Sequence, residues 1–238
     1  MGDPPVVLVT GASSGIGKAC ARRLAASGFR VFGSARSAPV GGEPFPLLHL
    51  DVRDNRSVNE CVSRILQEAG RIDVLVNCAG VAVGGSAEEM LMDEIQDQVE
   101  TNLLGLIRCC RAVLPGMRAR KTGLIVNMGS LAGQMGVPFQ SAYSAAKHGV
   151  EGYSESLAGK DSPYRKNLSA AMHSQAESEL RGWNVERIAR LVERVVRSRR
   201  PRFRYTPGPF VERIAPVARR IIPDRLFLSI LSGFYGVK

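Results

Sequence analysis

Residues 6–17 read VVLVTGASSGIG, an apolar run that passes at once into a turn with three glycines. The run at 6–10 is typical of a buried strand, and residues 15–27 continue with a helical pattern. Glycines between a strand and a helix let the backbone approach a pyrophosphate closely, and the helix N-terminus offers it unpaired N–H groups. Three glycines alone are a weak signal, because a tight strand–helix turn needs glycine anyway. At the first strand–helix junction of the chain, however, they predict a dinucleotide site.

Strand-like and helix-like segments alternate along the rest of the first 158 residues. The strand-like runs are apolar throughout, which is typical of strands buried on both faces of a parallel sheet. We therefore predict an α/β fold with a doubly wound, Rossmann-like parallel sheet between two helical layers, a three-layer α/β/α arrangement. The further strands are expected at residues 30–35, 46–50, 72–77 and 124–128, and the further helices at 55–69, 90–117 (one or two) and 143–157.

The length of 238 residues suits a single α/β domain. We expect residues 1–158 to form its dinucleotide-binding and catalytic part, and residues 159–238 to form a basic C-terminal substrate or lid part. The five cysteines have no metal-ligand spacing, so no metal site is predicted. Their odd number, with Cys109 next to Cys110, argues against a disulfide framework. No signal peptide or membrane-spanning run is evident, and we expect a cytoplasmic protein.

The formal net charge of +10 lies entirely in the last third of the chain. Residues 1–158 hold 15 basic and 15 acidic side chains, whereas residues 159–238 hold 17 and 7. This asymmetry favours an acidic partner, and the basic stretch at 213–231 suggests peripheral contact with an acidic membrane surface. A solvated basic helix face is an equally good interpretation. Nucleic-acid binding is not expected, because no aromatic platform accompanies the arginines.

Tyr143 and Lys147 stand four residues apart, and Ser130 precedes the tyrosine by thirteen residues. On a helix, positions i and i+4 share a face. An ammonium beside a phenol favours the phenolate and lowers a pKa that is normally about 10. A serine hydroxyl could hold the oxygen that the tyrosine protonates. The three residues predict an acid/base site, although a tyrosine and a lysine at this spacing can also share a helix surface by coincidence.

The glycine spacing is Gly-x-x-x-Gly-x-Gly, which differs from the Gly-x-Gly-x-x-Gly dinucleotide fingerprint and from a P-loop. Together with Ser130, Tyr143 and Lys147, it resembles the short-chain dehydrogenase/reductase family over residues 6–157. The resemblance implies a nicotinamide-dependent oxidoreductase with catalytic residues Ser130, Tyr143, Lys147 and Asn102, the last holding a water that relays protons. It implies cofactor contacts from Gly11, Ser13, Ser14, Gly15, Ile16, Gly17, Asp51, Val52, Asn77, Ala79, Gly80, Tyr143 and Lys147.

The end of the second expected strand decides between the two nicotinamide cofactors. An acidic residue there would bind a ribose 2′-hydroxyl, and an arginine would suit a 2′-phosphate. The sequence has Gly33, Ser34, Ala35 and Arg36 at this place, with no carboxylate. We therefore expect Arg36 to contact the cofactor and NADP to be preferred, with NAD as the alternative. A solvated strand end is the other interpretation of Arg36.

Residues 131–139 form an apolar loop between Ser130 and Tyr143, which could wall a hydrophobic pocket together with residues 81–83. Residues 129–157 resemble most the branch of the family that contains steroid 17β-dehydrogenases and retinol dehydrogenases. The resemblance implies a small lipophilic substrate, namely a secondary alcohol, a ketone or a retinoid-like molecule. It also implies a homo-oligomer, either a dimer or a tetramer.

The family pattern breaks after residue 157. Members of the family have a further long buried strand that ends in a Pro-Gly turn, whereas residues 159–176 of this chain are polar. We therefore expect the usual sixth strand to be missing and residues 202–205 to form the last edge strand. Three interpretations follow: a natural deletion form, a sequence with a segment omitted, or a sheet edge that residues 159–183 rebuild differently. The alternative function is a cofactor-binding but catalytically impaired protein that acts through partners or at a membrane surface.

Overall fold

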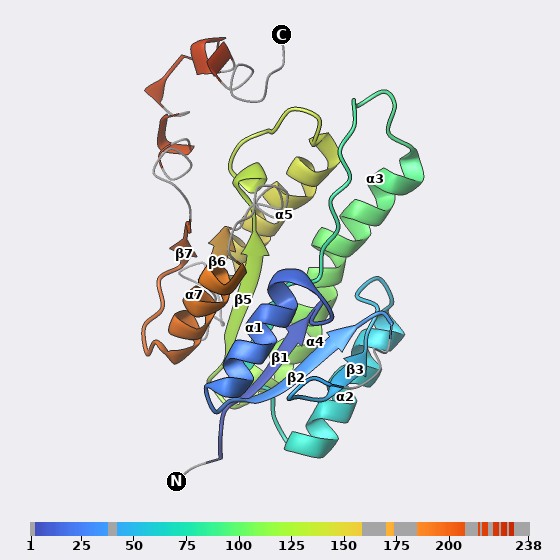
Figure 1. Ribbon diagram of the computed structural model, residues 1–238, viewed down its shortest axis with the longest axis vertical. Helices are drawn as coiled ribbons and strands as arrows, with labels where there is room; N and C mark the ends of the chain where they lie inside the picture. Colours follow the sequence, from blue (N-terminus) through green and yellow to red (C-terminus); the bar gives the residue numbers. More distant parts are fainter. Residues whose placement is uncertain are drawn as a thin grey trace.

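A seven-stranded parallel β-sheet runs through the centre of the computed structural model (Figure 1). The strand order is β3-β2-β1-β4-β5-β6-β7, and every neighbouring pair is parallel. The doubly wound sheet is therefore confirmed. The strands are β1 (Val6–Thr10), β2 (Arg30–Ala35), β3 (Leu47–His49), β4 (Val74–Asn77), β5 (Leu124–Gly129), β6 (Ala170–His173) and β7 (Arg204–Tyr205). The structure describes residues 3–37, 42–158, 170–173, 185–207, 214, 216–218, 221–223, 225–227 and 229–230.

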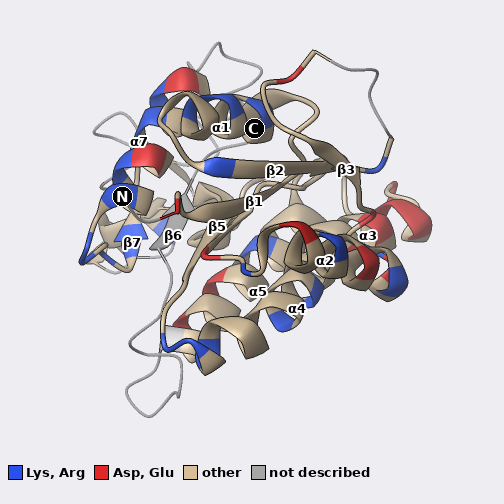
Figure 2. Cartoon of the chain, turned by 90° about the horizontal axis from the view of Figure 1, so that it is seen from below, with Lys and Arg blue, Asp and Glu red and all other residues tan. Residues whose placement is uncertain are grey.

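Helices cover both faces of the sheet, as Figure 2 shows. On one face α1 (Gly15–Ala26) lies beside α7 (Val185–Arg197). The other face is covered by α2 (Asn55–Ala69), α4 (Leu106–Ala119) and α5 (Ser141–Ala158). α3 (Met92–Val99) continues through a π-helical turn (Glu100–Gly105) into α4.

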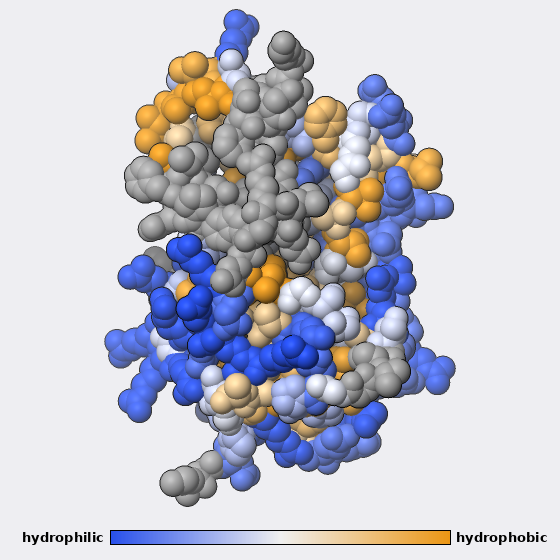
Figure 3. Space-filling view, viewed as in Figure 1, coloured by the Kyte–Doolittle hydropathy of each residue, from blue (hydrophilic) through white to orange (hydrophobic). Residues whose placement is uncertain are grey.

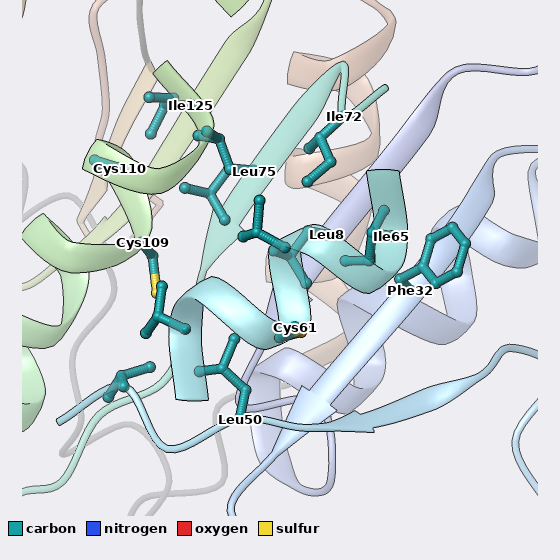
Figure 4. Packing of buried hydrophobic residues seen from close by; sticks show 14 of the residues in the cluster. Leu8, Phe32, Leu50, Cys61, Ile65, Ile72, Leu75, Cys109, Cys110 and Ile125 are labelled. Atoms are coloured by element: carbon teal, nitrogen blue, oxygen red, sulfur yellow. The ribbon is translucent and has the colours of Figure 1, made fainter. Parts of the chain in front are cut away.

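Each face of the sheet has its own apolar cluster. On one face Leu8 of β1 packs with Ile65 of α2 (Figure 4). On the other face Val7 packs with Leu24 of α1 and Val192 of α7. Successive strand residues point to opposite faces, so β1 is buried on both sides, as its unbroken apolar sequence predicts. All five cysteines are free, in agreement with the absence of a disulfide framework.

The sheet contains a sixth strand, so the expectation that this strand is missing is wrong. β6 pairs in parallel with β5, from Val126 opposite Ala170 to Gly129 opposite His173. β7 follows at the edge, within the stretch predicted for the last strand. The structure therefore shows the rebuilt sheet edge. β6 escapes prediction because the four residues Ala-Ala-Met-His include no β-branched side chain and no long apolar run. Residues 159–169 and 174–184, on either side of it, lie outside the described residues.

Ion pairs fix α7 to α1. The Glu193 carboxylate accepts hydrogen bonds from Ser27 (2.7 Å), Arg197 (3.0 Å) and Arg23 (2.6 Å), and Arg23 also pairs with Glu186. The hydrogen bond from Ser27 and those from the two arginines lower the pKa of Glu193 to about 2, against the opposing influence of desolvation. Of the basic residues in the last third of the chain, Arg197 is thus paired within the protein.

The last described turns, within residues 214–230, present apolar side chains to solvent (Figure 3). Phe227 is buried instead, against Leu131 and Met135 of the loop after β5. Among the described residues, no helix combines the length and apolar character that crossing a bilayer requires. The exposed large apolar side chains among the described residues of this segment are Ile214, Val217, Ile221, Leu226 and Ile230.

Candidate active site

A cavity of about 290 Å³ opens at the carboxyl ends of β1, β2, β4 and β5. The strand order reverses between β1 and β4, and ligands of open α/β sheets bind at such a point. None of the described residues that line the cavity is acidic, while Arg36 and Lys147 are basic, so the cavity favours an anionic ligand. Among the residues expected at the site, those that line the cavity are Gly11, Ser13, Ser14, Gly15, Ile16, Gly17, Arg36, Val52, Ala79, Gly80, Asn102, Tyr143 and Lys147.

The turn between β1 and α1 lies so close to neighbouring backbone that larger side chains would not fit. Gly11 has a φ of +66°, and a Cβ there would lie 2.9 Å from the backbone of Ala79. A Cβ on Gly17 would lie 2.2 Å from the carbonyl oxygen of Gly11. Oγ1 of Thr10 accepts hydrogen bonds from the N–H groups of Cys78 and Ala79, both at 3.1 Å. The glycine turn and the chain after β4 are therefore held together as one wall of the cavity.

The N-terminus of α1 reaches the cavity without a side-chain cap. Ser14 is the N-cap residue and makes no side-chain capping hydrogen bond, and the first turn holds no acidic residue. Ser14 and Gly15 both line the cavity. Helix N-termini carry unpaired N–H groups and a partial positive charge, which together suit a phosphate. Arg36, exposed just beyond the end of β2, adds a full positive charge to the same cavity.

Lys147 is buried on α5, with 6% of its surface exposed, and it lines the cavity. Its Nζ donates a hydrogen bond to the carbonyl oxygen of Met128 at 2.7 Å and lies 5.6 Å from the centre of the Tyr143 ring. Burial lowers the pKa of this lysine to about 8, against the opposing influence of Cys78 and Glu151. The prediction that Tyr143 and Lys147 share one helix face is confirmed.

Tyr143 lines the cavity, whereas Ser130 follows directly after β5 and is not among the lining residues. Tyr143 is 5% exposed and packs with Ala132 and Val137. Oγ of the buried Ser130 accepts a hydrogen bond from the N–H of Ala132 at 3.2 Å, which caps the 3₁₀ turn Leu131–Gly133. Ser130 therefore fixes the start of the apolar loop, and its contact with a substrate stays a prediction.

Asn102 lies in the π-helical turn between α3 and α4, a kind of turn that is frequent at functional sites. Its side-chain amide pairs with the backbone of Val81, since Nδ2 donates to the carbonyl oxygen at 2.7 Å and Oδ1 accepts from the N–H at 2.9 Å. A Cβ on Gly80 would lie 2.9 Å from the same Oδ1. The asparagine thus holds the loop after β4 in place, and the proton-relaying water stays a prediction.

Two residues expected at the cofactor, Asn77 and Asp51, are not among the residues that line the cavity. Nδ2 of Asn77 donates to Oδ1 of Asn127 at 2.9 Å, and Asn127 donates in turn to Ser154 of α5 at 2.9 Å. Asp51 pairs with Arg53 at 2.7 Å, and hydrogen bonds from this arginine lower the pKa of the carboxyl group. Asn77 is thus bonded to β5, and Asp51 is paired within its own loop between β3 and α2.

Sequence reasoning missed several residues of the cavity wall. Cys78 follows β4 directly, and the buried Thr101 precedes Asn102. Neither residue belongs to a recognisable motif. The one sequence signal for their position in the cavity wall is that each directly precedes a residue predicted at the site, Ala79 or Asn102. The other lining residues are Val81 and Ala82, which were expected at a substrate pocket, and Ala35, Leu50, Met128 and Gly129, which were not assigned to the site.

Comparison with known proteins places this geometry in a family. Residues 5–172, more than half of the chain, match the family described as short chain dehydrogenase. A 3-ketodihydrosphingosine reductase from Bacteroides thetaiotaomicron is 32% identical over 268 aligned positions, which cover 99% of this chain and 100% of that protein. A 3-oxoacyl-[acyl-carrier-protein] reductase from Vibrio cholerae is 40% identical over 160 residues, covering 64% of this chain and 66% of that protein.

Solved structures agree with the family match. A short-chain dehydrogenase from Streptomyces avermitilis has a TM-score of 0.82 at 27% identity, with 99% of this chain and 98% of that chain covered. A metagenomic short-chain oxidoreductase in complex with NADP has a TM-score of 0.74 at 29% identity, with 86% and 97% covered. The fold, the cavity and the sequence match therefore agree, and the chain belongs to the short-chain dehydrogenase family of oxidoreductases.

Proposed function

We propose that this protein reduces a lipophilic ketone to a secondary alcohol, or catalyses the reverse oxidation, with NADP(H) as the hydride carrier. The observation that carries the proposal is the position of Tyr143 and the buried Lys147 in a cavity that the glycine turn also lines. Reduction of a ketone needs a hydride for the carbon and a proton for the oxygen at one place, and the residues suited to holding a dinucleotide and to donating a proton meet here.

The residues of the cavity fit a dinucleotide. The uncapped start of α1 suits the pyrophosphate, with contacts proposed from the turn between Gly11 and Gly17. Arg36 suits a ribose 2′-phosphate, and NADP is the ligand named for the metagenomic relative. When bound, the nicotinamide supplies or accepts the hydride. Further contacts are proposed from Val52, Ala79 and Gly80.

Tyr143 carries the proton in the proposed mechanism. In reduction its phenol donates the proton to the substrate oxygen, and in oxidation its phenolate takes the proton from the alcohol. The Lys147 ammonium lowers the pKa of the phenol, because a nearby positive charge favours the phenolate. Ser130 holds the substrate oxygen, and Asn102 holds the water that relays protons.

The substrate is proposed to be a long-chain 3-keto compound. The two relatives above are named as reductases of a 3-keto or 3-oxo compound, and they do not single out the steroid and retinol branch of the family. The wall beside Tyr143 is apolar, since Ala132 and Val137 pack with the ring and Phe227 covers the same loop from the C-terminal side. Steroids and retinoids are the comparison substrates.

Replacement of Arg36 with aspartate is expected to shift the cofactor preference towards NAD. A carboxylate can bind the ribose 2′-hydroxyl but repels a 2′-phosphate, so the NADP/NAD ratio of kcat/KM should fall by at least about tenfold. Arg30→Asp, at the opposite end of β2, is the matched control and should leave the ratio unchanged. An unchanged ratio in Arg36→Asp would show that this arginine is a solvated strand end.

Replacement of Tyr143 with phenylalanine is expected to lower kcat by about 10²–10⁴-fold, the usual contribution of a general acid or base. NADPH binding, followed by fluorescence titration, should remain because the glycine turn is untouched. Tyr153→Phe removes a phenol from the same helix at a position that packs with the apolar cluster on the α2 and α4 side, and should retain activity. Near-wild-type turnover by Tyr143→Phe would overturn the mechanism.

A cofactor-binding protein without turnover is the second candidate function. The alignment with the sphingosine reductase extends over 268 positions against the 238 residues of this chain, so at least 30 positions of that relative have no counterpart here. Binding of NADPH without turnover of any long-chain 3-ketone, steroid, retinoid or simple ketone would favour this function over the reductase.

We also propose that residues 159–238 act as a lid whose tail rests on an acidic membrane surface, in a cytoplasmic homo-oligomer. Exposed apolar side chains such as Ile221 and Leu226 stand close in sequence to Arg219, Arg220 and Arg225. The protein should therefore sediment with vesicles of phosphatidylcholine and phosphatidylserine but not with phosphatidylcholine alone. Ile221→Asp should weaken this binding, whereas Leu66→Asp, on α2, should not. Equal sedimentation with both vesicle types would exclude an acidic-lipid contact.

A further inference from the structure

Glu151 is a buried carboxylate one helical turn beyond Lys147. It lies on α5 at position i+4 from the lysine, and it is 7% exposed, close to the 6% of Lys147. Positions i and i+4 share a helix face. Acidic side chains are seldom buried without a compensating partner, so a carboxylate at this place needs an explanation.

The 3₁₀ turn after β5 seals this face of α5. A Cβ on Gly133 would lie 2.7 Å from the carbonyl oxygen of Lys147 and 3.3 Å from Cγ of Glu151. Backbone of the turn therefore packs directly on the stretch of helix that links the two side chains. Where water is excluded in this way, charges act on one another more strongly than at the surface.

Arg204 binds Glu151 from the edge of the sheet. Its Nη2 donates to Glu151 at 2.8 Å and to Glu155 at 2.9 Å. Arg204 belongs to β7, which pairs with β6, so the arginine reaches α5 because β6 occupies the edge of β5. An arginine paired with a carboxylate favours its ionised form.

The groups that act on the Lys147 ammonium come from three elements. Met128 of β5 accepts its hydrogen bond, Cys78 follows β4, and Tyr143 and Glu151 belong to α5. Burial lowers the pKa of Lys147 to about 8, whereas Cys78 and Glu151 act in the opposite direction. Of these groups, Glu151 is the one that is bound by Arg204.

We propose that Glu151, fixed by Arg204, is a positioning residue that keeps Lys147 protonated, so that its ammonium can act on Tyr143. The inference rests on the proposed function, because it assigns Tyr143 as the acid and base. It connects the edge strand β7 to the chemistry through the chain Arg204, Glu151, Lys147 and Tyr143. Loss of the Glu151 charge leaves less of the lysine protonated, which makes the phenolate less stable.

The test compares Glu151→Gln with Glu155→Gln. Glutamine keeps the size and an acceptor oxygen but removes the charge, and each substitution weakens one of the two Arg204 contacts. In Glu151→Gln the limb of the kcat/KM–pH profile that reports Tyr143 should move to higher pH by about 0.5–1 unit, which lowers alcohol oxidation at pH 7 by about 3–10-fold. Glu155→Gln should keep the wild-type limb. An unmoved limb in Glu151→Gln, or equal shifts in both variants, overturns the proposal.

Glu151→Asp separates a charge effect from a folding defect. It retains the carboxylate and should keep the limb close to its wild-type position, even if its melting temperature falls as much as that of Glu151→Gln. A shift in Glu151→Asp equal to that in Glu151→Gln would assign the effect to packing and overturn the proposal.

Absorbance of the phenolate near 295 nm tests the same inference without turnover. The difference between each protein and its Tyr143→Phe counterpart isolates the titration of Tyr143. A higher midpoint in Glu151→Gln than in wild type supports the role of Glu151, and equal midpoints overturn it. An absence of turnover in wild type would contradict the proposed function while leaving this comparison decisive.

Discussion

The buried ammonium of Lys147 is the constraint on which the rest of the site depends. Transfer of a charged amine out of water costs several kcal/mol unless hydrogen bonds and opposite charge compensate. Here the carbonyl oxygen of Met128 accepts one hydrogen bond at 2.7 Å, and the Tyr143 ring and Glu151 stand on the same helix. α5 must therefore be held firmly against the end of β5, and the 3₁₀ turn packed on α5 contributes to this.

β5 is held in place by a hydrogen-bonded strand along each of its edges. β4 supplies one, and β6 supplies the other with four paired positions, from Val126 opposite Ala170 onward. The family match ends at residue 172, inside β6. The alignment with the sphingosine reductase contains at least 30 positions of that relative that this chain lacks. β6 and β7 thus complete the sheet over a short stretch of chain and bring Arg204 to α5, where it binds Glu151.

Much of the fold could be predicted because its signals are local. Residues 30–35 form a largely apolar run and are β2 at those bounds. Residues 55–69 have a helical period of apolar residues and are α2 at those bounds. β6 could not be predicted, since its four residues carry no such pattern and its pairing with β5 joins distant parts of the chain. At the site, the motifs identified which chain segments meet. They did not predict that the Asn77 side chain bonds Asn127, or that Arg204 contacts Glu151, 53 positions earlier in the chain.

The most direct test of this account is the pKa of Tyr143 in the wild-type protein. It is obtained from the phenolate absorbance near 295 nm as the difference between wild type and Tyr143→Phe, with NADP bound. If a buried, protonated Lys147 acts on the phenol, the midpoint should lie at least about one unit below the ordinary tyrosine value of about 10. A midpoint at or above 10 would contradict the account, because Tyr143 and Lys147 would then be neighbours without electrostatic consequence.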